Sequence, residues 1–100
     1  MTIVCAGRLY CDFIFTDLPR WPSLGTEVFA GGFGIHAGGG AFITGAHLVD
    51  LGHAVALATV TPRAPMSELL ARALTEARLD LSLCTPLPPG ADPQLTVALG

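Results

Sequence analysis

Lysine and asparagine are absent from this chain of 100 residues, and only 13% of its residues are charged. Its five basic residues are all arginines. Without lysine, the chain cannot supply the phosphate-binding lysine of a P-loop or a lysine Schiff base. Its formal net charge of -3 leaves no basic surface that would bind a nucleic-acid backbone through counterion release. We therefore expect no nucleic acid among its partners.

Cysteine is too sparse for a disulfide-stabilised secreted domain. Cys5, Cys11 and Cys84 form an odd set without CxxC spacing, which favours reduced thiols and a cytoplasmic protein. No apolar run approaches the roughly 18 residues that span a bilayer, so we expect no membrane segment. The histidines, His36, His47 and His53, lack the spacing of a metal site, and we expect no bound metal.

Hydrophobic residues make up 51% of the chain, and their pattern predicts alternating strands and helices in one domain. Met66, Leu69 and Leu70 begin the clearest helical pattern. The segments 2–6 and 54–60 are apolar enough for buried strands, and 41–51 for a buried helix. The predicted strands are 2–6, 10–16, 27–33, 54–60, 79–84 and 95–99, and the predicted helices are 41–51 and 66–77. This order favours an α/β fold with a mostly parallel sheet.

The predicted strand 10–16 has two different faces. Phe13 and Phe15 lie on one face, and Asp12, Ile14 and Thr16 lie on the other. A loop rich in proline follows, so we expect a hairpin-like pair with the segment 27–33. We expect the aromatic face to pack within a lid or against a second copy of the chain in a homodimer.

The motif with most chemical content is Gly38-Gly39-Gly40, directly before the predicted helix. Glycines let a ligand approach the backbone, and a helix start exposes free N–H groups. The alternative is a hinge or a tight helix entry. Asp12 either accepts hydrogen bonds from a polyol or satisfies backbone N–H groups. Cys11, beside it, has no evident base, and we assign it no chemistry.

The order of these elements resembles the N-terminal part of the PfkB, or ribokinase-like, sugar kinases. The resemblance rests on Val4 to Gly7, Asp12, the Gly25 to Glu27 segment, Gly38 to Ala41, and Leu51-Gly52, and it spans nearly all 100 residues. It implies a layered α/β fold with a small β-lid within residues 10–34. It also implies that Asp12 hydrogen-bonds sugar hydroxyls and that Gly38 and Gly39 bring their backbone against the sugar, and we expect Gly40 to line the same pocket.

The chain departs from the family pattern at three places. Ile43 stands where the family commonly has asparagine, and Pro62-Arg63-Ala64 replaces a Gly-Asp-Asp type segment. The family's downstream GxGD segment, with the catalytic aspartate and the ATP site, is missing. The resemblance therefore implies ATP and Mg²⁺ as cofactors of a longer parent protein, with none bound to this chain alone.

We expect that this chain alone is not a competent kinase, because phosphoryl transfer needs a base and stabilisation of the moving phosphate. The strand that stops at the chain's end suggests truncation, so exposed apolar surface should make the isolated piece poorly soluble or self-associating. The alternative function is a non-catalytic α/β binding or oligomerisation module. A Rossmann-type oxidoreductase is disfavoured, because no GxGxxG follows the first strand.

Overall fold

The computed structural model describes residues 1–100 and builds its inner layer on two parallel strands. Strand β1 (Thr2–Ala6) pairs with β4 (Ala54–Ala58) in continuous parallel register. An isolated parallel bridge joins Ala56 to Asp80 at the other edge of β4. Helix α1 (Gly40–Asp50) packs against both strands, with the buried Gly45 close to Val55 and Cys5. The chain between β1 and β4 includes two further strands and ends in α1, which returns it so that β1 and β4 run in the same direction.

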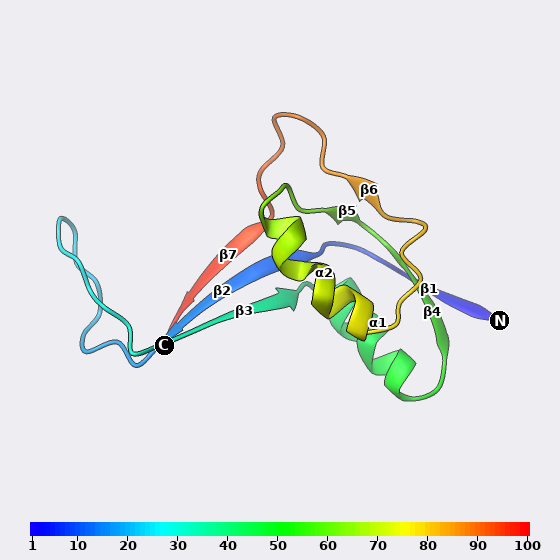
Figure 1. The fold of residues 1–100 in the computed structure, drawn as a ribbon, viewed down its shortest axis with the longest axis horizontal. Helices are drawn as coiled ribbons and strands as arrows, with labels where there is room; N and C mark the ends of the chain where they lie inside the picture. Colours follow the sequence, from blue (N-terminus) through cyan, green and yellow to red (C-terminus); the bar gives the residue numbers. More distant parts are fainter.

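A second sheet projects from this inner layer. Its central strand is β2 (Tyr10–Thr16), which pairs antiparallel with β3 (Gly32–Gly38) and parallel with β7 (Leu95–Leu99). We call these three strands the outer sheet. Figure 1 shows that it extends away from β1 and β4, with the 17–31 loop at its far end. The molecule is accordingly long and thin, 52 × 33 × 18 Å, with a radius of gyration of 15.5 Å, whereas a compact chain of this length has about 13 Å.

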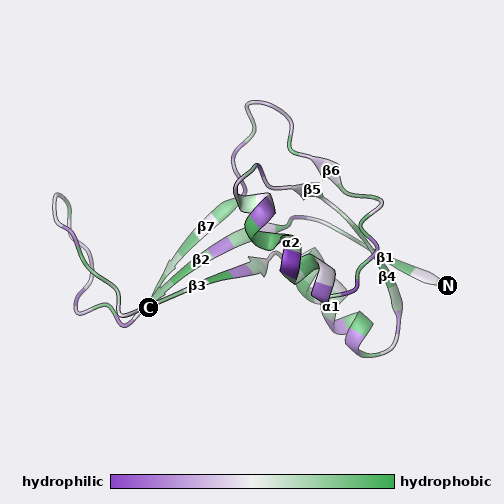
Figure 2. Cartoon of the chain, in the orientation of Figure 1, coloured by the Kyte–Doolittle hydropathy of each residue, from purple (hydrophilic) through white to green (hydrophobic).

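The hydrophobic core lies where the two sheets meet. Helix α2 (Met66–Glu76) packs on β2 and β3 and buries Leu70 and Leu74. Polar residues occupy its outer side, and Figure 2 shows hydrophilic and hydrophobic bands alternating along it. The most exposed side carries an Arg72–Glu76 ion pair of 2.8 Å. The buried core consists of Leu9, Cys11, Val55, Leu57, Leu70, Leu74 and Leu79.

The prediction of α2 is confirmed nearly to the residue, as are the strands 2–6, 10–16 and 95–99. The start of α1 and its end before Gly52, whose φ is +96°, also agree with the predicted helix. The predicted hairpin partner was misplaced, since β3 begins at Gly32 rather than at residue 27. Glycine has low strand propensity, but pairing with β2 outweighs that preference.

The predicted strand at 79–84 is wrong. That segment makes only the bridge at Asp80, and the chain pairs again later, where β6 (Thr85–Pro86) lies beside β5 (Val60–Thr61). Burial was also overestimated for β1 and α1. Ile3 and Cys5 pack towards the core, but Val4 points to the opposite face and is 55% exposed. Neither helix is long and apolar enough to cross a membrane.

Two adjacent leucines of α2 test where the core lies. Leu70 is 1% exposed, whereas Leu69 is 45% exposed. We expect Leu70→Ala to lower the free energy of unfolding by about 2–5 kcal/mol, because it leaves a cavity. Leu69→Ala is the matched control and should change it by well under half of that amount. Urea unfolding followed by circular dichroism measures both, and equal losses would contradict this placement of the core.

A candidate binding site at the base of the outer sheet

The candidate site lies where β1 and β4 end, α1 begins and the outer sheet joins the inner layer. The N–H of Gly7, just past β1, donates to the carbonyl of Ala58 at the end of β4, at 3.2 Å. In open α/β sheets, ligands bind outside the carboxyl ends of the strands. The fold therefore places the motifs before α1 and at the start of β2 in the region where a ligand is expected.

Two hollows flank Arg8 at this position. The larger has a volume of about 450 Å³ and opens at the start of α1. Its lining residues are Cys5, Ala6, Gly7, Arg8, Gly40, Ala41 and Thr44. The smaller, of about 250 Å³, is lined by Gly7, Arg8, Thr59, Val60, Leu87, Pro88, Ala91, Asp92 and Gln94. Arg8 and Gly7 are thus common to both hollows.

Arg8 is the cation of this region. Its guanidinium donates a hydrogen bond of 3.1 Å to the hydroxyl of Tyr10 and lies 5.9 Å from the centre of the Tyr10 ring. This hydrogen bond, with the negative charge of Asp92 as a further cause, raises the pKa of Arg8 above its ordinary value. Arg8 is exposed and can reach a ligand in either hollow.

Asp12 lies on the outer sheet with its carboxylate held from one side. Its Oδ1 accepts a hydrogen bond of 2.6 Å from the hydroxyl of Thr96, its register partner on β7. Its Oδ2 occupies the space where a Cβ of residue 38 would lie. The structure therefore brings Asp12 and Gly38 into contact, and a side chain at position 38 would displace the carboxylate.

The other two glycines of the motif have different surroundings. Gly39 has a φ of +97°, and a Cβ there would overlap the carbonyl oxygen of Arg8. Both the backbone angle and this close approach require glycine. A Cβ at Gly40 would meet no atom within 4 Å, and this residue lines the larger hollow. Only Gly39 is thus needed for the tight entry into α1, and Gly40 leaves the hollow open.

The predicted site residues therefore meet in one region without sharing one cavity. Asp12 contacts Gly38 on the outer sheet, whereas Gly40 lines a hollow that does not include Asp12. Arg8 and Thr96 were missed by sequence reasoning. A cation directly after the first strand is a signal that could have indicated Arg8. No local signal indicates Thr96, because its pairing with β2 joins residues 84 positions apart.

Neither Cys11 nor the histidines add chemistry to this site. Burial, followed by the charge of Asp12, raises the pKa of the Cys11 thiol, which favours the unreactive protonated form. No three His, Cys, Asp or Glu side chains lie close enough to hold a metal ion. The imidazole Nε2 of His36 lies 2.9 Å from where a Cβ of Gly34 would be, so it folds along β3 away from Gly38.

The positions that depart from the family pattern lie near this region. Ile43 is in the first turn of α1 and is 48% exposed, so no core contact explains an apolar residue there. Pro62 is buried, and the guanidinium of Arg63 donates a 3.4 Å hydrogen bond to the carbonyl of Ala91. Arg63 thereby attaches the start of α2 to the loop that lines the smaller hollow.

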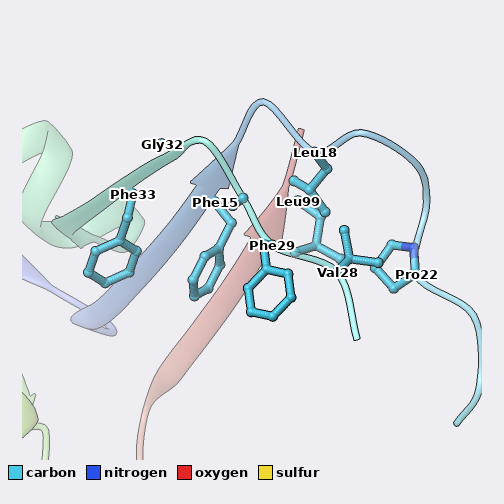
Figure 3. Close-up of a pocket in the computed structure, with 9 residues that line it drawn as sticks. Phe15, Leu18, Pro22, Val28, Phe29, Gly32, Phe33 and Leu99 are labelled. Atoms are coloured by element: carbon cyan, nitrogen blue, oxygen red, sulfur yellow. The ribbon is translucent and has the colours of Figure 1, made fainter. Parts of the chain in front are cut away.

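The far end of the outer sheet holds an apolar hollow of about 440 Å³. Figure 3 shows the rings of Phe15, Phe29 and Phe33 on the same side of the strands. The rings of Phe15 and Phe33 have centroids 5.0 Å apart. This agrees with the aromatic face predicted for the strand 10–16. The lining residues are Phe15, Leu18, Pro22, Val28, Phe29, Ala30, Gly32, Phe33 and Leu99.

No protein-family model and no curated protein matches the sequence. Solved structures do match the fold, each over its N-terminal portion. A candidate ribokinase from Agrobacterium tumefaciens superposes with a TM-score of 0.79 and 21% identity, over 98% of this chain and 31% of its own. The chain has the ribokinase-like fold. A fructokinase from Xylella fastidiosa gives a TM-score of 0.71 at 20% identity, over 98% of this chain and 29% of its own.

A nucleoside kinase from Methanocaldococcus jannaschii, described as an archaeal member of the ribokinase family, gives a TM-score of 0.72 at 20% identity. That match covers 88% of this chain and 29% of the kinase. The chain thus spans about three tenths of the length of the ribokinase-like structures that it matches. At these identities the likeness establishes the α/β fold, as the sequence predicted, and the activity is a separate question.

Two neighbouring glycines test the geometry at the start of α1. We expect Gly39→Ala to destabilise the chain by about 1–3 kcal/mol, because alanine disfavours positive φ and its Cβ would meet the carbonyl of Arg8. Gly40→Ala is the control, since its Cβ meets no neighbour. Thermal unfolding measures both variants. If Gly40→Ala proved the more damaging, the described helix entry would be wrong.

Proposed function

We propose that this chain is the sugar-binding and lid portion of an ATP-dependent carbohydrate kinase. The observation that carries the proposal is the carboxylate of Asp12 lying over Gly38, at the base of a sheet that projects from the carboxyl ends of β1 and β4. In this proposal the outer sheet is the lid. The lid then consists of β2, β3 and β7, and it extends beyond the residues 10–34 that we expected from the sequence. The ribokinase-like fold supports it.

The residues of the site suit a polyhydroxylated ligand. A carboxylate accepts strong hydrogen bonds from hydroxyl groups, and glycine backbone lets a sugar ring approach closely. In this proposal Asp12 accepts from the substrate hydroxyls with Gly38 beside its carboxylate, Gly39 forms the tight entry into α1, and Gly40 lines the larger hollow at the start of that helix. Arg8 adds a donor at the edge of both hollows. These groups bind and orient the sugar, so their contribution is positioning of the attacking hydroxyl.

The phosphate donor belongs to the remainder of the parent protein. The fructokinase from Xylella fastidiosa and a sugar kinase from Pyrococcus horikoshii have been solved with ATP. The residues of this chain do not fit a Mg²⁺–ATP site, because it has no lysine and no cluster of three acidic or histidine side chains. In this proposal ATP and Mg²⁺ are cofactors of the full-length enzyme, and we expect the chain by itself to be inactive.

The alternative is a non-catalytic α/β binding or oligomerisation module, favoured by the exposed apolar residues of the outer sheet. The coding sequence beyond Gly100 distinguishes the two functions. A downstream GxGD segment supports the kinase, and a stop codon supports the module. We place the kinase in the cytoplasm, consistent with three free cysteines. Its partner is a small sugar or sugar-like substrate rather than a nucleic acid or a membrane.

Asp12 provides the direct test in the full-length protein. We expect Asp12→Asn to raise the KM for the sugar roughly 10- to 100-fold, because a charged hydrogen-bond acceptor is lost. The KM for ATP should change by less than about twofold, since ATP binds elsewhere. Asp17→Asn is the matched control, because Asp17 is an exposed residue in the loop just after β2. Steady-state assays with ATP, Mg²⁺ and a panel of sugars give both constants.

The isolated chain is the control for where catalysis resides. Turnover by residues 1–100 alone would contradict the assignment of the ATP site to the remainder. Equal effects of Asp12→Asn on the sugar and on ATP would contradict the role of Asp12. Absence of phosphoryl transfer by the full-length protein to every sugar tested would favour the non-catalytic module.

We infer a second copy of the chain as the partner of the aromatic face. Trp21 and Leu24 are exposed on the same loop that supplies part of the lining of the apolar hollow, so in this proposal the loop of each copy contacts the hollow of the other. Phe29→Ser should shift the dimer towards monomer in sedimentation experiments, because it removes an exposed ring of the hollow. Leu83→Ser, at a 50% exposed leucine outside the outer sheet, is the control. Equal oligomerisation of both variants would contradict this interface.

A further inference from the structure

The hydrogen bond between Thr96 and Asp12 joins two strands that are far apart in the sequence. Strands β2 and β7 pair in parallel, and Asp12 and Thr96 are register partners, so their side chains lie on the same face of the outer sheet. The Oγ1–Oδ1 distance of 2.6 Å is typical of a hydroxyl donating to an ionised carboxylate. Among the side-chain hydrogen bonds of the structure, it is the shortest and connects the most distant residues.

This hydrogen bond fixes the direction of the second carboxylate oxygen. A carboxylate is planar, so holding Oδ1 against Thr96 also determines where Oδ2 lies. Oδ2 occupies the space over Gly38, which has no side chain to fill it. Thr96 has a restricted side-chain torsion because it is branched at Cβ, which limits the positions available to its hydroxyl. The two strands and the glycine therefore hold one oxygen engaged and direct the other towards the region before α1.

We propose that Thr96 is a positioning residue that orients Asp12 for the substrate. Its hydroxyl donates to Oδ1, so that Oδ2 is the acceptor presented to a sugar hydroxyl. The bond to Thr96 uses one lone pair of Oδ1, so the carboxylate keeps a fixed orientation while Oδ2 is free to accept from the substrate. This inference rests on the proposed function and adds a residue that no local sequence pattern indicates.

The test compares Thr96→Val with Thr96→Ser in the full-length enzyme. Valine keeps the shape and the Cβ branch but removes the hydroxyl, whereas serine keeps the hydroxyl and removes only the methyl group. We expect Thr96→Val to raise the KM for the sugar about tenfold, as expected when a hydrogen bond to a charged group is lost. Thr96→Ser should restore a KM within about twofold of the parent value, and the KM for ATP should not change in either variant.

A double-mutant cycle measures the coupling between Thr96 and Asp12 in their effects on the KM for the sugar. Thr96 acts only through Asp12 in this proposal, so Thr96→Val should add little to the KM of an Asp12→Ala variant. Independent effects that simply multiply would overturn the inference. So would equal impairment by valine and serine, which would assign the effect to packing. If Thr96→Val does not fold, Thr96→Ala replaces it. If neither of these variants folds but Thr96→Ser does, the hydroxyl is needed for stability, and the positioning role is overturned.

The outcomes separate this inference from the proposed function. If Asp12→Ala raises the sugar KM while Thr96→Val does not, the kinase assignment stands and the role of Thr96 is wrong. If Asp12→Ala leaves the sugar KM unchanged, Asp12 does not bind the sugar and the proposed function itself fails.

Discussion

The candidate site depends on the hydrogen-bonded position of β2 between β3 and β7. Each neighbour contributes one part of the site. Strand β3 brings Gly38 beside Asp12, and β7 brings the hydroxyl of Thr96. Because side chains alternate along a strand, a shift of the pairing by one residue would turn Asp12 towards the aromatic face. The backbone ladders therefore determine the position of the carboxylate before any side-chain interaction acts on it.

The alternation of side chains along β2 also makes the two faces of the outer sheet chemically different. Residues of β2 alternate between Cys11 and Phe13, which pack towards the core and the other aromatic rings, and Asp12, whose carboxylate lies against Gly38 and Thr96 on the opposite face. A sheet with one apolar and one polar face can cover a polar ligand and still pack elsewhere through its rings. The outer sheet also projects from the inner layer, which gives the molecule its elongated shape and leaves apolar residues exposed at the sheet's far end.

Much of the fold could be predicted because local patterns dominate it. The spacing of Met66, Leu70 and Leu74 determines α2, and the apolar run of β4 determines a buried strand. The segment 79–84 was predicted as a strand from its leucines, but only Asp80 bonds to β4. The site was predicted in part, since Asp12 and Gly38 carry local signals. The contact with Thr96 could not be predicted, because a parallel pairing across 84 residues leaves no local pattern.

Because Asp12 is held by Thr96 of β7, its surroundings are completed only when the last strand of the chain has been synthesised and has paired with β2. Strands β2 and β3 leave the ribosome well before Leu95–Leu99 and can already form a hairpin. Until β7 docks, one edge of β2 is open, and non-local pairing is a slow step because the intervening chain must first be closed into a loop. A nascent chain that ends before residue 95 would hold the carboxylate and its glycine neighbour but would lack the hydroxyl that completes the candidate site.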